Sequence, residues 1–592
     1  MFKHHICLHD ELTEVVEIYT VDGDLIAKGE MTIQPNKSPV IEAINPRNIG
    51  NLKESTFRVC THSGVWYTLL ECAVYDHGRI YPKVIIKSDS HDGVFKTVKF
   101  VIRGLSQWFD NSKFTDAGDD HVTKYLNTNT LSTEIKDDDL GGISISSENW
   151  WQTNSKKGGI FTISEYTVIS LEAVSASFSC VSAINYIHRI RNLLSILIGY
   201  PLVIDYCFNI EDKRKTSIYF VAFQEDEQAF ENKQACLVPS RYLFSEGVWA
   251  NILKNALETN RDNFLTIWSR LPGLSGFSKY WEYELLACVS LTDRYAAVFS
   301  STSDEKITNG QYRKLKRCLK SAVKDFAKDI GEGKINAVVI DSIIEQVNAI
   351  KNTSLPSFQS CFEHAYNSMS DDFRVIIDLS DDDFNHLKKL RNQIAHGDDP
   401  DTKLDGFITH EIILQNKLLV ILYCWALRDF GIAESDCIKF LSNWLHPIIR
   451  AADLNKTELD KATGHYNFLP LNKKDFNDIA KLKFGAITLE HTGNGKNYRY
   501  RKDLQQVMNN WISDRSADRP RNLEKYLTLH VDTDRIQSLC YVNSIYVENG
   551  SQSHCTGGVC ILNPPRELID ENRFWKYDPE INTWCQPLKD DQ

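Results

Sequence analysis

One short stretch of the sequence combines a permanent positive charge with a titratable ring. Arg391, Asn392 and His396 lie in the segment Arg391-Asn-Gln-Ile-Ala-His396. Arginine keeps its charge at physiological pH and can neutralise phosphoryl oxygens, whereas histidine can give or accept a proton near neutrality. A counter-charge beside a proton carrier is what the cleavage of a phosphate ester requires. These three residues are therefore the candidate catalytic group.

The residues around this group predict a helix that spans 381–396. Ser380, followed by three aspartates, is typical of a helix N-cap with an acidic first turn. Apolar residues then recur at three- and four-residue steps and form one stripe, which consists of Phe384, Leu387, Leu390 and Ile394. Gly397 suits the left-handed position that ends a helix. Arg391 then lies at the edge of the apolar stripe, and His396 lies in the last turn.

The segment Arg391–His396 resembles the Arg-Asn-x-x-x-His signature of HEPN ribonucleases. The longer stretch LRNQIAHGD resembles the ApeA-type HEPN proteins of bacterial anti-phage defence in particular. Arg-Asn also occurs at positions 47, 191 and 521, but no histidine stands five positions beyond those arginines. The resemblance implies a metal-independent endoribonuclease of the abortive-infection type, a toxin to its own cell, that works without a cofactor.

The resemblance also implies a mechanism and partners. The ribose 2′-hydroxyl would attack the neighbouring phosphate, with His396 as base or acid, Arg391 stabilising the pentacoordinate phosphate and Asn392 orienting the histidine or a phosphate oxygen. The products would be a 2′,3′-cyclic phosphate and a 5′-hydroxyl. We expect a homodimer through the HEPN domain, an RNA substrate with the tRNA anticodon arm as the first candidate, and a phage component as the trigger.

Length and composition limit the class of protein that can carry this site. A chain of 592 residues is too long for one core, so two to four domains are expected. Hydrophobic residues make up 42% and charged residues 25%, as in an ordinary folded protein, and a net charge of −12 argues against a protein that coats nucleic acid indiscriminately. Fifteen scattered cysteines and the lack of a long apolar run favour a cytoplasmic protein with reduced thiols and no membrane span.

We expect an α+β multidomain protein with three parts. Residues 1–243 form a β-rich N-terminal domain, which the resemblance makes a sensor or regulatory domain, with strands at 81–86, 94–102 and 161–169 and a helix near 179–198. Residues 244–452 form the central all-α HEPN bundle. Its helices are expected at 245–258, 276–300, 310–330, 334–351, 381–396, 407–431 and 434–449. Residues 453–592 form a small mixed α/β domain.

Two sets of residues are candidates to support the catalytic group. HEPN families often place a carboxylate on their first long helix near the motif arginine. Asp293, at the margin of the apolar side of helix 276–300, resembles that carboxylate, with Glu284 as the second candidate and a plain surface acid as the alternative. RNA-binding cations are expected at Arg313, Lys316, Arg317, Lys388 and Lys389. The polar face of an ordinary helix is the alternative for these cations.

No metal is assigned to the chain. The acidic loops 116–120 and 137–139 are most simply solvated, although they leave open a metal-dependent nuclease. Cysteine and histidine gather near the end of the chain without a Cys-x-x-Cys spacing, so zinc stays open at Cys540, His554, Cys555, Cys560 and Cys585. The main alternative function is a non-catalytic HEPN module for dimerisation or ligand binding, with the β-rich domain as the recognition element.

Overall fold

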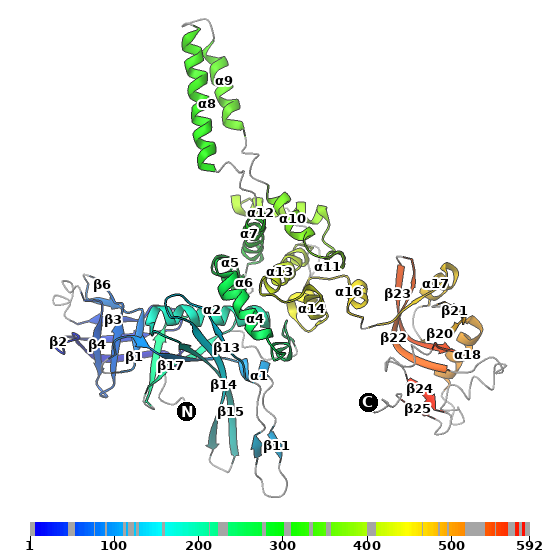
Figure 1. The fold of residues 1–592 in the computed structure, drawn as a ribbon, viewed down its shortest axis with the longest axis horizontal. Coiled ribbons are helices and arrows are strands. Elements are labelled where there is room, and N and C mark those ends of the chain that lie inside the picture. Colours follow the sequence, from blue (N-terminus) through cyan, green and yellow to red (C-terminus); the bar gives the residue numbers. More distant parts are fainter. Residues whose placement is uncertain are drawn as a thin grey trace. The chain divides into compact units, whose positions relative to one another are not determined.

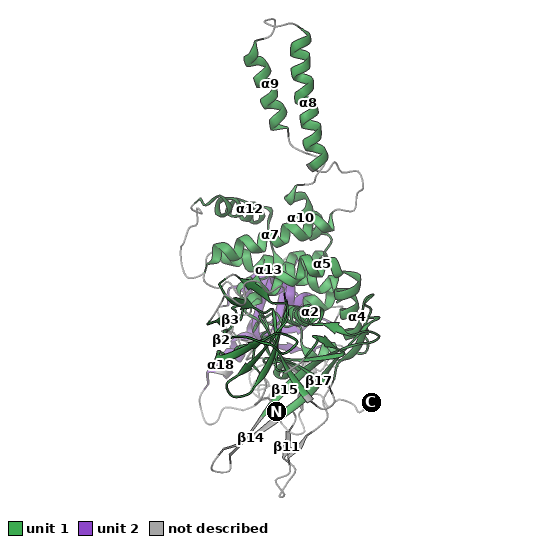
Figure 2. Cartoon of the chain, turned by 90° about the vertical axis from the view of Figure 1, so that its left-hand side faces the viewer, with its two compact units in different colours: residues 1–454 green, residues 455–592 purple. Residues whose placement is uncertain are grey.

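The structure, a computed structural model, describes most of the chain and divides into two compact units, residues 1–454 and residues 455–592 (Figures 1 and 2). The described residues are 6–44, 54–75, 77–88, 91–109, 114–116, 123–125, 130–156, 160–211, 214–222, 235–274, 280–300, 309–330, 336–350, 357–398, 410–464, 466–482, 486–493, 497–514, 539–550, 552–565, 575–578 and 583–585.

The first part of unit 1 is built on one long antiparallel sheet. Its order is β13-β14-β15-β10-β17-β18-β8-β5-β4-β1-β2-β3-β7-β6. The strands are β1 (Leu12–Tyr19), β2 (Leu25–Ile33), β3 (Val40–Ala43), β4 (Phe57–Thr61), β5 (Trp66–Leu70), β6 (Ala73–Tyr75), β7 (Arg79–Tyr81), β8 (Val84–Ile86), β10 (Thr97–Ile102), β13 (Ser132–Ile135), β14 (Ile143–Lys156), β15 (Ile160–Ala173), β17 (Ile204–Glu211) and β18 (Arg214–Phe220). Short pairs are formed by β9 (Val94–Phe95) with β16 (Phe178–Ser179) and β11 (Phe114–Asp116) with β12 (Thr123–Tyr125). The strand expected at 161–169 lies within β15, whereas the one expected at 81–86 is the end of β7 and then β8, and the one expected at 94–102 is divided into β9 and β10, which pair in different sheets.

The helix α2 (Cys180–Ile198) is the main helix of this β-rich part. Ser179 caps its start by accepting a hydrogen bond from the Ser182 amide, and Gly199 ends it with a φ of 83°. Its buried side includes Ile187, Ile190 and Leu194, which lie at helical spacing. The shorter α1 (Leu105–Phe109) follows β10 and buries Trp108, whose indole donates to the Val238 carbonyl. The helix expected near 179–198 is confirmed.

Between residues 240 and 451 the elements that the structure describes are helices. Short helices come first, α3 (Ser240–Leu243), α4 (Val248–Lys254), the π-helix η4 (Asn255–Thr259), α5 (Arg261–Thr266), the 3₁₀ turn η5 (Trp268–Arg270) and α6 (Leu271–Leu274). A bundle follows, in which α7 (Trp281–Phe299) packs against α10 (Phe358–Asn367), α12 (Asp381–His396) and α13 (His410–Asp429). Further helices are α11 (Asp371–Ile377), α14 (Glu434–Phe440) and α15 (Pro447–Ala451).

Two expectations for the helical part were wrong. The single helix expected at 434–449 is two helices, because the chain turns after Phe440 and Pro447 starts α15 at the first helical position, where its missing N–H costs no hydrogen bond. The bundle helix α10 was not expected at all. Ser357 caps it, and its buried side carries Phe362 and Tyr366 one turn apart, so a local signal was present.

The helices α8 (Asn309–Asp329) and α9 (Ala337–Ala349) form a hairpin between α7 and α10 in the sequence. They pack against each other, and the Lys316 ammonium donates to the Asn348 carbonyl at 2.8 Å. Both views show the hairpin extending away from the bundle helices of the same unit (Figures 1 and 2). Both helices were expected, at 310–330 and 334–351.

Unit 2 is a mixed sheet with helices. Its strand order is β21-β20-β23-β22-β24-β25, with β19 pairing in parallel with β22. The elements are α16 (Lys456–Thr463), β19 (Phe468–Pro470), α17 (Lys473–Ala480), β20 (Ala486–His491), β21 (Tyr498–Tyr500), α18 (Lys502–Ser513), β22 (Leu539–Asn549), β23 (Gln552–Leu562), β24 (Trp575–Asp578) and β25 (Thr583–Cys585). The α+β class, with a β-rich part, a helical part and a small mixed part, is thus confirmed. Among the described helices, none is long and apolar enough to cross a membrane.

Candidate functional site

The helix α12 has the bounds and the caps that its sequence predicts. The Ser380 hydroxyl accepts from the Asp383 amide and the Asp383 carboxylate accepts from the Ser380 amide, both at 3.1 Å, which is a reciprocal capping box. At the other end Gly397 has a φ of 75°, and the Asp398 amide donates back to the Gln393 carbonyl. The residues that the helix buries are Phe384, Leu387 and Leu390. Local sequence therefore fixes where this helix ends.

The candidate catalytic residues lie in the last two turns of α12. Arg391 is half-buried, and its Nη1 donates to the Asn392 Oδ1 at 3.1 Å. Asn392 and His396 are exposed to solvent. The three residues thus lie within six positions at the C-terminal end of α12, two of them exposed and the third half-buried.

The carboxylate predicted beside Arg391 lies on α7. Asp293 is half-buried, and burial raises its pKa while the charge of Arg391 opposes that rise. Glu284, the second candidate, has a different neighbour. Burial raises the pKa of Glu284, and a hydrogen bond with the Gln415 side chain on α13 opposes the rise. The charge of Arg391 therefore acts on Asp293, whereas the neighbour that acts on Glu284 is Gln415.

The five candidate RNA-binding cations fall into two groups. Lys388 and Lys389 lie on α12, where Lys388 donates to the Gln359 side chain of α10 at 2.6 Å and Lys389 is exposed. Arg313, Lys316 and Arg317 lie on α8, whose packing partner is α9. Among the described residues the structure does not bring these two groups into one basic surface. Their role in RNA binding stays a prediction.

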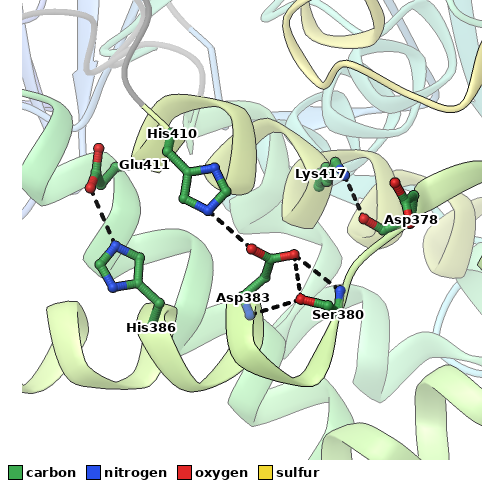
Figure 3. Close-up of polar contacts among 7 residues, drawn as sticks. All are labelled: Asp378, Ser380, Asp383, His386, His410, Glu411 and Lys417. Atoms are coloured by element: carbon green, nitrogen blue, oxygen red, sulfur yellow. Dashed lines mark hydrogen bonds and ion pairs between the residues drawn. The ribbon is translucent and has the colours of Figure 1, made fainter. Parts of the chain in front are cut away.

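Two histidine–carboxylate pairs, which the sequence did not predict, join α12 to α13 (Figure 3). His386 on α12 lies 3.2 Å from Glu411 on α13, and His410 on α13 lies 3.0 Å from Asp383 on α12. The two imidazole rings stack with centroids 6.1 Å apart. We call these four residues the histidine clamp. The clamp holds the first turn of α13 against the first two turns of α12, the motif helix that carries Arg391 and His396. It thereby supports the position of Arg391.

The clamp also bears on protonation at the start of α12. Burial raises the pKa of Asp383, but hydrogen bonds from Ser380 and His410 outweigh burial, so the pKa of this carboxyl lies below its usual value. Lys417 on α13 is buried and donates to the Asp378 carbonyl at 2.5 Å, just before α12 begins (Figure 3). The start of the motif helix is therefore held by one capping box and three contacts with α13.

In the part of the chain that the structure describes, nothing supports a metal site at the acidic loops or at the cysteines and histidine near the end of the chain. Among the described histidine, cysteine, aspartate and glutamate residues, no group of three or more is placed to hold a metal ion. In the loop 137–139, Asp137 accepts hydrogen bonds from Tyr186 and from the Leu140 amide, which makes it a turn residue. Most of the loop 116–120, and the side chains of Cys540 and Cys585, lie outside the described residues.

The bundle and its open motif helix point to one class of protein. Residues 286–436, from within α7 to the start of α14, match the family described as Apea-like HEPN. Residues 17–244 match ApeA N-terminal domain 1, which covers the β-rich part. The two matches follow each other along the chain, the N-terminal domain first and the HEPN domain second. The chain therefore belongs to the ApeA-like HEPN proteins of anti-phage defence. No curated protein and no solved structure matched the chain in the same comparisons.

Proposed function

We propose that the chain is a metal-independent HEPN endoribonuclease whose activity defends bacteria against phage. The observation that carries the proposal is the C-terminal end of α12, where a half-buried Arg391 stands beside an exposed Asn392 and five residues before an exposed His396. The HEPN match over residues 286–436 supports it independently. Together they provide a counter-charge and a proton carrier on a surface that RNA can reach.

The chemistry follows from RNA itself. A ribose 2′-hydroxyl lies next to each phosphate, so cleavage requires a base for that hydroxyl, an acid for the departing 5′-oxygen and a cation for the charge that develops between them. His396 supplies the base or the acid, and a second copy of His396 across a homodimer interface supplies the other. Arg391 stabilises the phosphoryl oxygens, Asn392 orients them, and Asp293 steadies the guanidinium. The products are a 2′,3′-cyclic phosphate and a 5′-hydroxyl.

The proposed biological role is abortive infection. A free ribonuclease is toxic to its host, so a phage component would release the site from restraint by the β-rich domain. A structured RNA with an unpaired loop suits a site that must reach a splayed nucleotide, and the anticodon arm of tRNA is the first candidate. DNA lacks the 2′-hydroxyl and should remain intact.

The test compares two variants with matched controls on RNA in the presence of EDTA. His396→Ala and Arg391→Ala should each lower cleavage by about a hundredfold or more, because each removes a group that acts in the transition state. His364→Ala and Arg294→Ala change exposed residues of α10 and α7 and should cleave like the wild type. Full cleavage by His396→Ala, loss of wild-type cleavage in EDTA, or unfolding as the sole effect of Arg391→Ala would each contradict the proposal.

The alternative function is a HEPN module that binds RNA or a partner without cutting it. It is favoured by one observation, the separation of Arg313, Lys316 and Arg317 on α8 from Lys388 and Lys389 on α12. Gel-shift binding by the wild type that leaves the RNA intact, even after infection, would support this module. Cyclic phosphate ends on the bound RNA would exclude it.

A further inference from the structure

The α8–α9 hairpin exposes an unusual amount of apolar surface. Phe326 on α8 is 60% exposed, and large aliphatic side chains are exposed on both helices. Helical geometry puts all of them on one side except Val338, which lies about 100° from Val339 on α9. At about 100° per residue, Leu315, Leu319 and Phe326 of α8 fall within one narrow stripe, and so do Val339, Ile343 and Ile350 at α9. Both stripes lie on the same side of the plane that contains the two helix axes. We call these six residues the apolar hairpin face.

The opposite side of the hairpin is charged. The same helical geometry places Arg313, Arg317 and Lys324 of α8 there, next to Asp341 and Glu345 of α9. A hairpin with one charged and one apolar side cannot bury the apolar side by itself, because only two helices are present. Exposed apolar patches of this kind mark sites of association.

We propose that a second copy of this chain covers the apolar hairpin face, with the two hairpins related by a two-fold axis that makes α8 antiparallel to its copy. The first argument is the spacing of the face. The midpoint of Leu315 and Phe326 falls between Lys320 and Ser321, and the midpoint of Val339 and Ile350 falls between Ile344 and Glu345.

These two midpoints lie at one height on the hairpin. The hydrogen bond from Lys316 to the Asn348 carbonyl sets the register of the antiparallel helices, and it brings both midpoints level to within about a turn of helix. A two-fold axis through that level maps the apolar hairpin face onto itself. Leu315 then meets the partner's Phe326, and Leu319 meets the partner's Ala322, a large residue against a small one. Such self-complementarity is what an isologous interface requires.

The second argument is charge. The outer edge of α8, beside the apolar stripe, carries Lys314 near one end and Asp325 and Asp329 near the other. An antiparallel pairing about the same level places Lys314 of each copy next to the partner's two aspartates, as flanking charges do in paired helices. A parallel arrangement would place α8 against the partner's α9 and leave these charges unmatched. Both arguments therefore select one occupant and one orientation.

This association is independent of the catalytic proposal, because its residues lie on α8 and α9 and not on α12. The resulting four-helix contact would be a self-association surface separate from any dimer formed by the motif helices. It leaves the charged side of the hairpin, with Arg313, Arg317 and Lys324 beside Asp341 and Glu345, facing outward.

The first experiment measures molar mass by light scattering and sedimentation, on protein that carries His396→Ala so that cells tolerate expression. Leu319→Glu with Ile343→Glu should reduce the mass by half relative to that parent. Lys324→Glu, on the charged side, should not. An equal mass for the parent and the Leu319→Glu, Ile343→Glu variant would overturn the proposal. If the masses are equal and the parent binds vesicles of anionic phospholipid, the proposal is overturned as well, because a lipid surface and not a second copy then covers the apolar hairpin face.

The second experiment keeps the test valid if the double variant loses helix by circular dichroism. Lys314→Glu should weaken association several-fold, because it meets two partner aspartates. Adding Asp325→Lys and Asp329→Lys to the same chain should restore it. Restoration supports the antiparallel pairing, and a triple variant that associates no better than Lys314→Glu would overturn it.

Discussion

Burial and the neighbouring Arg391 guanidinium have opposite effects on the pKa of Asp293. Burial disfavours the ionised carboxylate and the charge of Arg391 favours it, and the pKa of Asp293 is raised on balance. A carboxyl whose pKa is raised on folding costs stability when it is ionised, so at neutral pH this group destabilises the fold. The charge of Asp293 therefore does not stabilise the fold at neutral pH, and we predict that its role is to act on Arg391.

This balance gives a prediction for Asp293→Asn. The variant should melt no lower than the wild type at pH 7, since it removes a half-buried charge. Its kcat for RNA cleavage should fall about tenfold, as for other groups that orient a functional side chain, with little change in KM.

Asp293→Glu, which keeps the charge, should recover part of the rate and serves as the control. Wild-type kcat in Asp293→Asn would make Asp293 an ordinary surface acid. A lower melting temperature would mean that the residue supports the fold.

At the scale of the helix, α12 is held at its start by the capping box and the histidine clamp and is open at its end. Asp383 belongs to both devices, because its carboxylate accepts from the Ser380 amide and hydroxyl and pairs with His410. These contacts hold its pKa below the usual value. A lowered aspartate pKa contributes stability above the ordinary pKa of the unfolded chain, and this stability is lost as pH falls through the folded pKa.

We therefore predict a pH-dependent effect for Asp383→Asn. The variant should have a lower melting temperature than the wild type at pH 7, and the difference should shrink as pH falls below the ordinary aspartate pKa. Calorimetry across that range measures it. Asp382→Asn, at an exposed position in the same first turn, should show a smaller and flatter effect. A difference that is constant with pH would mean that the Asp383 charge has no part in the clamp.

Local features were the predictable part of these elements. The bounds of α12 follow from Ser380, the apolar stripe and Gly397, which act within a few residues of one another. That Asp293 would lie near enough to Arg391 to feel its charge was expected from helix periodicity and from the resemblance together, and its role beside the arginine stays a prediction. The clamp between His410 and Asp383 could not be foreseen, because it depends on how α13 returns to α12 after the intervening chain. The strand order could not be predicted either, because β10 pairs with β15 and β17 from distant parts of the sequence.

At the scale of the whole of unit 1, the β-rich and helical parts meet at Gly199. This glycine ends α2 with a φ of 83°, and a Cβ atom built on it would lie 2.2 Å from the Nε2 of His446, just before α15. His446 is buried, and burial lowers its pKa to about 4, so the ring is neutral. The Asn443 side chain also donates to the Cys236 carbonyl across the same region. The two parts are therefore packed directly against each other around Gly199 and His446.

We predict that Gly199→Ala destabilises unit 1 by about 2 kcal/mol or more, because it combines a left-handed backbone with a steric clash. Gly64→Ala is the matched control, since Gly64 has a φ of 81° and nothing within 4 Å of its Cβ position. The control should lose only the backbone contribution. Denaturant unfolding of both variants gives the difference. Equal losses would mean that His446 moves aside at no cost.

The α8–α9 hairpin leaves the bundle between α7 and α10, two helices that pack directly on each other. At the exit point the Ser300 hydroxyl donates to the Cys361 carbonyl at 3.4 Å. The chain therefore departs and comes back at neighbouring positions, so the bundle closes without help from the arm. The hairpin is therefore an insertion that the bundle does not need for its own packing. Its length and its surface can be changed by an engineer while the C-terminal end of α12 keeps its supports.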